Sequence, residues 1–198
     1  VYCSLPGFAP DDPRAAHPAW EGVLGAATFS PAQLEAELRW IDAHVGGKPY
    51  GIDVIIPSTY DAEAERAAGD LDQLIPAEHK AFMEKLLADE GVAPLPADER
   101  VRIHREIVEG RGSMTPQGAR RLVETALAHP QVKMVVSALG APPADVVAAL
   151  RANGVVVGAM CGKASHAQRQ RAAGVELIVA QGTEAGGHTG DIATMVLV

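Results

Sequence analysis

The residues best suited to chemistry lie in one short stretch, Val179 to Gly190, which reads VAQGTEAGGHTG. After an apolar run, this stretch places Gln181, Glu184 and His188 among four glycines. Glycine at this density lets the backbone approach another group closely, or adopt positive φ, at a cost in chain entropy. A bound ligand is a good reason for a chain to accept that cost.

Three kinds of group in this stretch suit ligand binding. Gln181 follows a predicted strand, and its amide both donates and accepts hydrogen bonds, which suits the edge of a heterocycle. Gly186 and Gly187 allow backbone N–H groups to reach a ring or a phosphate, although a plain turn would also use such a pair. His188, with an unperturbed pKa of about 6.5, is a good proton acceptor at neutral pH.

Further polar residues follow other predicted strands. Asp53, Ser137, Met160 and Lys163 all lie at or near the carboxyl ends of apolar runs, where a barrel would bring them together. Lys163 either presents a cation to an anionic ligand or faces solvent, and the sequence leaves both interpretations open. The two cysteines lie far apart and match no metal-binding or redox spacing, so we expect reduced thiols and no metal site.

The composition is that of an ordinary globular protein. Of the 198 residues, 47% are hydrophobic and 21% charged, so the chain can bury one core. A net charge of −8 argues against nucleic acid or an anionic membrane surface as a partner. No apolar run approaches the ~20 residues that span a bilayer, and the N-terminus lacks a signal pattern. We expect a cytoplasmic protein that binds a small molecule, with its oligomeric state open.

Local patterns predict the elements that position these residues. Ser30 to Gln33 form a capping box with proline at the first helical position, and one apolar stripe follows until Gly46 and Gly47 end the helix. The run Tyr50 to Pro57 is short, apolar and rich in β-branched residues, which is typical of a buried strand. The run Gly22 to Ala27 predicts another strand before the helix.

From residue 131 onward, predicted strands and helices alternate regularly. The expected order is strand Val132 to Ala138, helix Ala144 to Ala152, strand Val155 to Ala159, helix Ala164 to Ala173 and strand Val175 to Ala180. This rhythm describes consecutive βα units in a parallel sheet, for which doubly wound sheets and (β/α)8 barrels both fit. We favour the barrel because polar residues and glycines gather just after strand ends, where barrel active sites are built.

The segment from residue 58 to residue 113 interrupts this rhythm. It mixes acidic and basic residues with prolines and is too long for a βα loop. Residues 77–90 predict an amphipathic helix through Phe82, Leu86 and Leu87. We therefore expect a helical insertion at 58–113, which is either a solvated excursion or a lid over the site.

The stretch from Gln181 to Gly190, with the strand 175–180 before it and the run 50–57 upstream, resembles the nitronate monooxygenases, formerly called 2-nitropropane dioxygenases. The likeness runs from about Gly22 to Val198, and the motif is highly specific for this FMN-barrel superfamily. It implies an FMN-dependent (β/α)8 barrel that oxidises alkyl nitronates with O2 to a carbonyl compound and nitrite. The partners that it implies are therefore a nitronate and O2.

The resemblance also implies roles for single residues. His188 would be the catalytic base or the group that orients the nitro compound, and Gln181, Gly186 and Gly187 would contact FMN. Asp53 falls where the family usually has an asparagine beside the flavin. A carboxylate donates no hydrogen bond unless it is protonated, and its charge opposes negative charge on reduced flavin. At this position the sequence departs from the family pattern.

Two further departures concern the ends of the chain. The first twenty residues do not resemble the strand and glycine-rich turn with which family members open, and the two glycine loops that hold the FMN phosphate are not in the sequence. We therefore expect residues 1–198 to form a partial barrel domain, about strands two to six of eight. The competing interpretations are an FMN-dependent enoyl-acyl-carrier-protein reductase, an NAD(P)H:quinone reductase and a non-catalytic fragment that cannot hold FMN.

Overall fold

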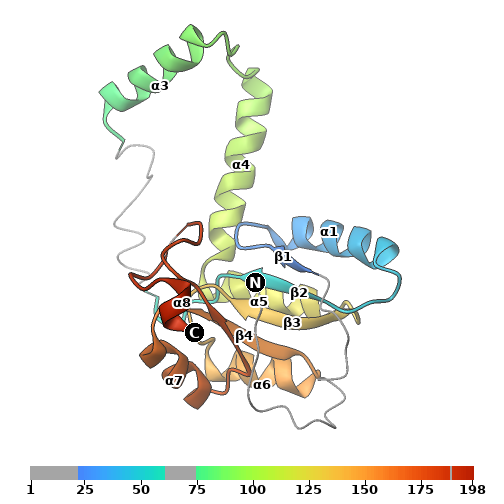
Figure 1. Ribbon diagram of the computed structural model, residues 1–198. Coiled ribbons are helices and arrows are strands. Elements are labelled where there is room, and N and C mark those ends of the chain that lie inside the picture. Colours follow the sequence, from blue (N-terminus) through green and yellow to red (C-terminus); the bar gives the residue numbers. More distant parts are fainter. Residues whose placement is uncertain (1–21, 61–74, 188) are drawn as a thin grey trace. The chain divides into compact units, whose positions relative to one another are not determined.

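The computed structural model describes residues 22–60, 75–187 and 189–198 (Figure 1). Its strands are β1 (Val23–Gly25), β2 (Tyr50–Val54), β3 (Val132–Ser137), β4 (Val156–Cys161) and β5 (Leu177–Ala180). Its helices are α1 (Pro31–His44), α3 (Ala77–Asp89), α4 (Ala97–Ser113), α5 (Pro116–Leu127), α6 (Ala144–Ala152), α7 (Ala164–Ala172) and α8 (Thr194–Leu197). The chain divides into two compact units, Val1–Ser58 with Val108–Val198, and Thr59–Ile107.

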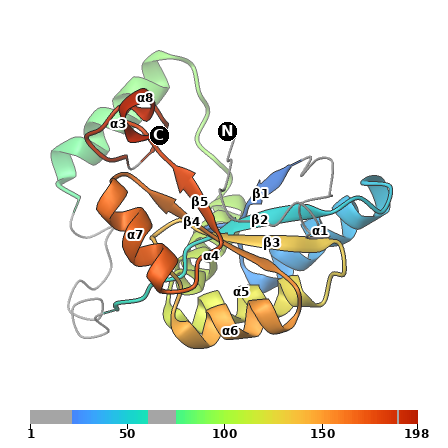
Figure 2. The same ribbon diagram turned by 60° about the horizontal axis from the view of Figure 1, so that its bottom comes forward.

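The first unit is built on one sheet of five parallel strands in the order β1-β2-β3-β4-β5. Because parallel crossovers are right-handed, an order that never reverses places the connecting helices on the same face. A doubly wound sheet, in contrast, reverses its order and carries helices on both faces. Figure 2 shows α1, α5 and α6 together on one side of the sheet. The predicted barrel-type α/β fold is confirmed.

The main core fills the space between the sheet and these helices. Leu34 of α1, Leu122 of α5 and Leu150 of α6 are fully buried in it. The strands contribute Ile52 and Val135, which are also fully buried, from the same face of the sheet. Each fully buried side chain of this size stabilises the fold by roughly 1.5–3 kcal/mol relative to an exposed one. This layer therefore holds the helices against the sheet.

The opposite face of the sheet, which is the inner face in a barrel, carries a second and smaller cluster. Met134, Val136 and Val156 are its buried members. Side chains alternate along a strand, and the register of β2 with β3 places Gly51 beside Met134 and Asp53 beside Val136. A carboxyl group thus lies among apolar neighbours near the carboxyl end of β2.

Helix α1 begins and ends as its sequence predicts. The Ser30 side chain accepts a hydrogen bond from the Gln33 backbone N–H at 3.3 Å, and the Gln33 side chain accepts one from the Ser30 N–H at 2.8 Å. After the helix, Gly46 and Gly47 adopt φ values of 65° and 76°, a region that other L residues rarely occupy. The capping box and the glycine stop are therefore both confirmed.

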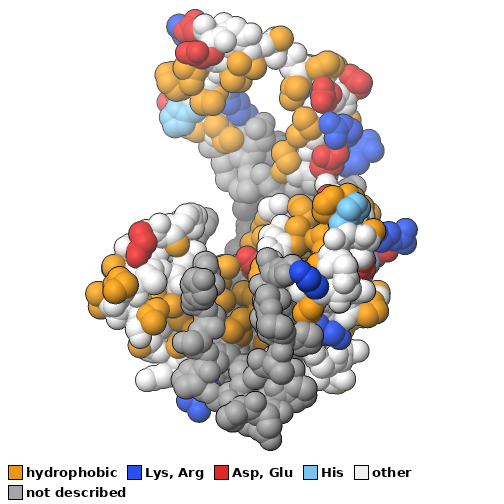
Figure 3. Space-filling model, turned by 45° about the vertical axis from the view of Figure 1, so that its right-hand side comes forward, with side chains coloured by type: hydrophobic (Ala, Val, Ile, Leu, Met, Phe, Trp, Pro, Cys, Tyr) orange, Lys and Arg blue, Asp and Glu red, His pale blue; other side chains and the backbone are white. Residues whose placement is uncertain are grey.

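The second unit holds α3 and most of α4. Helix α3 coincides with the predicted helix, yet none of its residues is buried. Phe82, Met83, Leu86 and Leu87 share one stripe and are between 42% and 64% exposed. Figure 3 shows hydrophobic side chains gathered on the surface of this unit. In the described ranges, no helix has the length and apolar character needed to cross a membrane.

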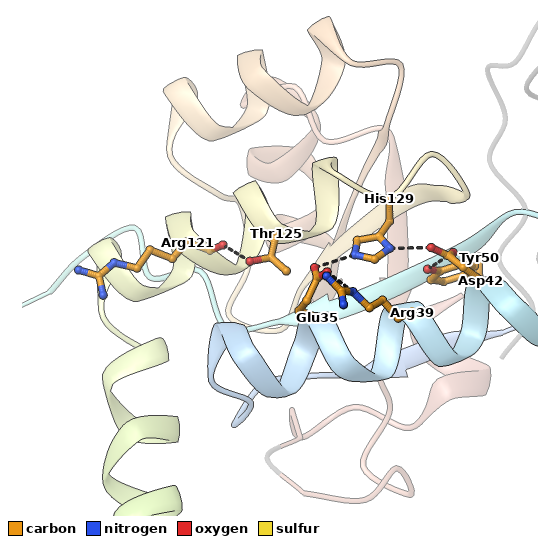
Figure 4. Close-up of polar contacts among 7 residues, drawn as sticks. All are labelled: Glu35, Arg39, Asp42, Tyr50, Arg121, Thr125 and His129. Atoms are coloured by element: carbon orange, nitrogen blue, oxygen red, sulfur yellow. Dashed lines mark hydrogen bonds and ion pairs between the residues drawn. The ribbon is translucent and has the colours of Figure 1, made fainter.

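The buried side chain of His129 links two residues of α1, and one of these also bonds to the first residue of β2 (Figure 4). The side chain of His129 is 8% exposed, and its Nδ1 lies 2.6 Å from Asp42 Oδ2 while its Nε2 lies 2.9 Å from Glu35 Oε2. Tyr50, the first residue of β2, donates to the other carboxylate oxygen of Asp42 at 2.8 Å. Because both ring nitrogens face acceptors, the arrangement is satisfied only when the imidazole carries both protons.

The two carboxylates set the charge of this histidine. Burial alone lowers the pKa of His129, but the hydrogen bonds to Asp42 and Glu35 outweigh burial and raise that pKa overall. His129 in turn, followed by Arg39, lowers the pKa of Glu35. The network therefore stabilises the fold while the ring is charged and the carboxylates are ionised.

We predict that His129→Ala costs more stability in mild acid than in base. The contribution of a histidine whose folded pKa is raised is fully present below its unfolded pKa, about 6.5, and is lost as the pH rises through the folded value. Urea unfolding should show a loss of about 1–3 kcal/mol at about pH 6 and a smaller loss at about pH 9. His79→Ala, which changes an exposed histidine of α3, is the control. An equal loss at both pH values contradicts a charged His129.

Candidate functional site

The parallel strands end at the same edge of the sheet, and a cavity of about 670 Å³ lies there. Its walls come from α7 and from the segments that follow β3, β4 and β5. The lining residues include Leu139, Met160, Lys163, Gln170 and Gln181. The volume falls in the range of roughly 300–1,000 Å³ that is typical of small-molecule sites.

Gln181 lines this cavity directly after β5. Its backbone N–H donates to the carbonyl of Cys161 at 2.9 Å, which extends the pairing of β4 with β5. Strand β4 runs past its predicted end at Ala159 because Cys161 pairs with Ala180. The side-chain Nε2 of Gln181 lies 3.5 Å from the carbonyl oxygen of Gly186, a long contact that leaves the amide available to a ligand.

At Gly182, the loop after β5 packs closely against Thr194, the first residue of α8. A Cβ at this position would lie 2.2 Å from Thr194 Oγ1 and 2.3 Å from Thr194 N. Glu184 accepts a hydrogen bond from the same Thr194 N–H at 3.1 Å, which ties the loop to α8. The pKa of Glu184 is lowered first by its own backbone N–H and then by that of Thr194. Gly182 and Glu184 are therefore required by the shape of the loop.

The three remaining glycines of the motif have contrasting surroundings. Gly190 packs against Gly162, since a Cβ on Gly190 would lie 2.8 Å from the carbonyl oxygen of Gly162. Gly186 and Gly187 are exposed, and no atom of the described residues lies within 4 Å of a Cβ built on either of them. Gly187 also adopts a φ of 77°. Their backbone is the open part of the loop, and their contact with a ligand stays a prediction.

The cavity brings together some of the expected residues and leaves others outside its lining. Gln181, Met160 and Lys163 share its wall. Asp53 and the pair Gly186–Gly187 lie outside that lining. His188 lies outside the described residues, so its role also stays a prediction.

Ser137 was expected to converge on the site, and this expectation is wrong. Ser137 does end β3, but it is fully buried and in register with Val54 and Ala159, both members of the main core. Because side chains alternate along a strand, Ser137 faces the helices while its neighbour Val136 shares the inner face with Asp53. A strand end alone therefore does not decide which residue reaches the site.

Asp53 combines burial with a missing partner. Its register partners on either side are Gly25 and Val136, and its Oδ1 is buried without a hydrogen bond to any described residue. Burial raises the pKa of Asp53 to about 6. Near neutral pH the group therefore lies close to the change between an acid that donates a hydrogen bond and a carboxylate that only accepts.

Gln170 is a residue of the cavity wall that sequence reasoning missed. It is 4% exposed, its Nε2 donates to the Met160 carbonyl at 2.7 Å, and its Oε1 has no partner among the described residues. The sequence did contain a signal for this residue, because α7 reads ASHAQRQRA and has no large apolar residue. A helix between two buried strands normally presents an apolar stripe to the sheet. A glutamine in its place indicates a polar wall.

Comparisons with known proteins agree with this architecture. The sequence pattern of the family described as nitronate monooxygenase matches residues 21–198. The protein named "Putative monooxygenase Rv1533" of Mycobacterium tuberculosis is 47% identical over 180 residues, which cover 89% of this chain and 46% of that protein. The chain thus spans less than half the length of this relative.

Two further likenesses are more limited. An octahydro-1H-indene-4-carboxyl-CoA dehydrogenase of Rhodococcus jostii is 43% identical over 58 residues, 29% of this chain and 16% of that protein. The solved nitroalkane oxidase from Streptomyces ansochromogenes has a TM-score of 0.55 at 24% identity, covering 85% of this chain and 40% of that one. At this identity the structural likeness supports the fold.

We predict that Asp53→Asn stabilises the chain near neutral pH and much less in acid. Burial raises the pKa of Asp53 from 3.8 to about 6, so its ionisation destabilises the fold. This cost is absent below the unfolded pKa, grows between the two values and is complete above the folded pKa. The Tm should rise by a few degrees at about pH 8 and by less at about pH 4.5. Asp191→Asn, at an exposed position, is the control. A Tm difference that does not change with pH contradicts a buried, titrating Asp53.

Proposed function

Because the chain belongs to the nitronate monooxygenase family, we propose that it supplies a flavin site at which an alkyl nitronate is oxidised by O2 to a carbonyl compound and nitrite. The observation that carries this proposal is the cavity lined by Gln181 at the carboxyl ends of β3, β4 and β5. The match of residues 21–198 to the nitronate monooxygenase family supports it. On this proposal, residues 58–113 are a helical insertion within a barrel domain that includes residues 1–198.

The residues present fit FMN in the chemistry that they offer. The edge of its ring system carries both hydrogen-bond donors and acceptors, and the amide of Gln181 can serve both kinds. Gly186 and Gly187 add exposed backbone groups. The unpartnered Oδ1 of Asp53 needs a donor, or itself donates once the acid is protonated. We assign these four residues to FMN contact.

FMN, when bound, would supply the acceptor for the electrons of the nitronate. His188 takes the α-proton of a neutral nitroalkane, which makes the nitronate within the site. Gln181 orients the ring edge through its amide. Asp53 in its neutral form would offer a hydrogen-bond donor to the cofactor and would add no negative charge to the site. The cavity wall also includes the apolar residues Leu139 and Met160.

We predict that His188→Ala lowers kcat/KM for nitroethane by roughly 10² to 10⁴, the range for loss of a general base. Ethylnitronate is already deprotonated, so its oxidation should lose only what a positioning hydrogen bond contributes, about 0.5–1.5 kcal/mol. O2 uptake and nitrite formation are measured with both substrates at saturating FMN. The flavin content of each protein is determined alongside, and His104→Ala at an exposed position of α4 is the control.

Two outcomes would contradict this proposal at separate points. Equal losses with the two substrates would exclude His188 as the base while leaving the oxidation in place. Absence of nitronate oxidation by the flavin-loaded protein, together with NAD(P)H consumption in the presence of a crotonyl thioester or a quinone, would replace the proposed activity by that of a reductase.

A further inference from the structure

The α7 side of the cavity carries positive charge without matching negative charge. Lys163 and Arg169 both line it, with His166 between them along the helix. Among the described residues, the lining includes no aspartate or glutamate. The ion pairs of these residues include neither Lys163 nor Arg169. In a chain of net charge −8, composition does not account for a basic wall. The wall therefore favours an anionic ligand.

The start of α7 adds to this charge. Lys163 is the N-cap residue, and its side chain makes no capping hydrogen bond. The helix has nine residues, so its aligned peptide dipoles place partial positive charge at this end. The N–H of His166 donates to the Lys163 carbonyl at 2.9 Å, whereas the N–H groups of Ala164 and Ser165 precede the first hydrogen bond of the helix. The backbone at the start of α7 and the side chains of its basic residues thus both present positive charge to the cavity.

Gln170 points independently to a ligand on the same wall. Its Nε2 is held by the Met160 carbonyl, and its Oε1 is left as a buried acceptor without a partner among the described residues. A buried polar atom that finds no hydrogen bond costs about 1–3 kcal/mol. A ligand N–H or O–H group that reached this oxygen would remove the cost.

We propose that this wall is a subsite for a phosphate-bearing part of the substrate. Lys163 and Arg169 pair with the phosphate oxygens, and Gln170 accepts a hydrogen bond from an amide or amino group of the same molecule. The inference rests on the proposed function and adds a substrate class to it: a nitronate or its analogue joined to a phosphorylated carrier. The partner is defined by this combination of anion and hydrogen-bond donor.

The phosphate group of FMN is the alternative anion for this basic wall. Barrel enzymes frequently hold a phosphate in the loops after strands seven and eight. Lys163 instead follows β4, which is strand five when the five strands of the sheet are strands two to six of the barrel. The position of the basic wall therefore favours the substrate as the source.

The test is calorimetric titration of the flavin-free chain with inorganic pyrophosphate and with coenzyme A. Both should bind to wild type, and added salt should weaken the binding. Lys163→Ala and Arg169→Ala should each weaken binding about tenfold or more, as expected for a lost hydrogen bond to a charged group. Arg171→Ala removes an exposed arginine of the same helix that lies outside the cavity lining, and it should bind as wild type does.

Three outcomes decide against the proposal. Absence of binding to wild type, or equal weakening by Arg171→Ala, overturns the subsite. Displacement of pyrophosphate by FMN but not by riboflavin assigns the subsite to the cofactor and overturns the substrate assignment. Displacement by coenzyme A with no effect of FMN supports it. Because these titrations involve no turnover, failure of nitronate oxidation would overturn the proposed function and leave the subsite standing.

Discussion

The unbroken order of five parallel strands is the constraint on which the rest of the structure depends. With right-handed crossovers, it places the connecting helices on one face and the carboxyl ends of the strands along one edge. The segments after β3, β4 and β5 therefore meet, and residues as distant in sequence as Leu139 and Gln181 line one cavity. No local motif achieves this, because the ten residues from Gln181 supply only part of the wall.

The polar residues that stabilise the fold and the polar residues of the candidate site lie at opposite ends of the strands. At the amino ends, His129 is held between Asp42 and Glu35, and this charged network fixes α1 against the start of β2. At the carboxyl ends, polar atoms such as Asp53 Oδ1 and Gln170 Oε1 are buried without partners among the described residues. Satisfied polar groups at one end and unsatisfied ones at the other are typical of a scaffold that carries a binding site.

The sequence predicted local elements better than the roles of single residues. The capping box at Ser30 and the alternation from residue 131 are local patterns, and they were sufficient for α1 and for β3 to β5 with their helices. Helix α5 is not predicted, although Thr115 and Pro116 form its start, because it follows a charged segment interpreted as an insertion. The inward Asp53 and the outward Ser137 depend on register between strands, and the burial of Gln170 depends on packing of α7, neither of which one sequence displays.

The central claim, that the carboxyl ends of β3, β4 and β5 form the flavin site, is tested most directly by amide chemical shifts of the ¹⁵N-labelled chain during titration with FMN. We expect the largest shifts at Gln181, Gly186 and Gly187, smaller ones near Asp53, and almost none around His129 at the opposite edge. Shifts centred on the amino ends of the strands, or no shifts at any concentration of FMN, would contradict the claim.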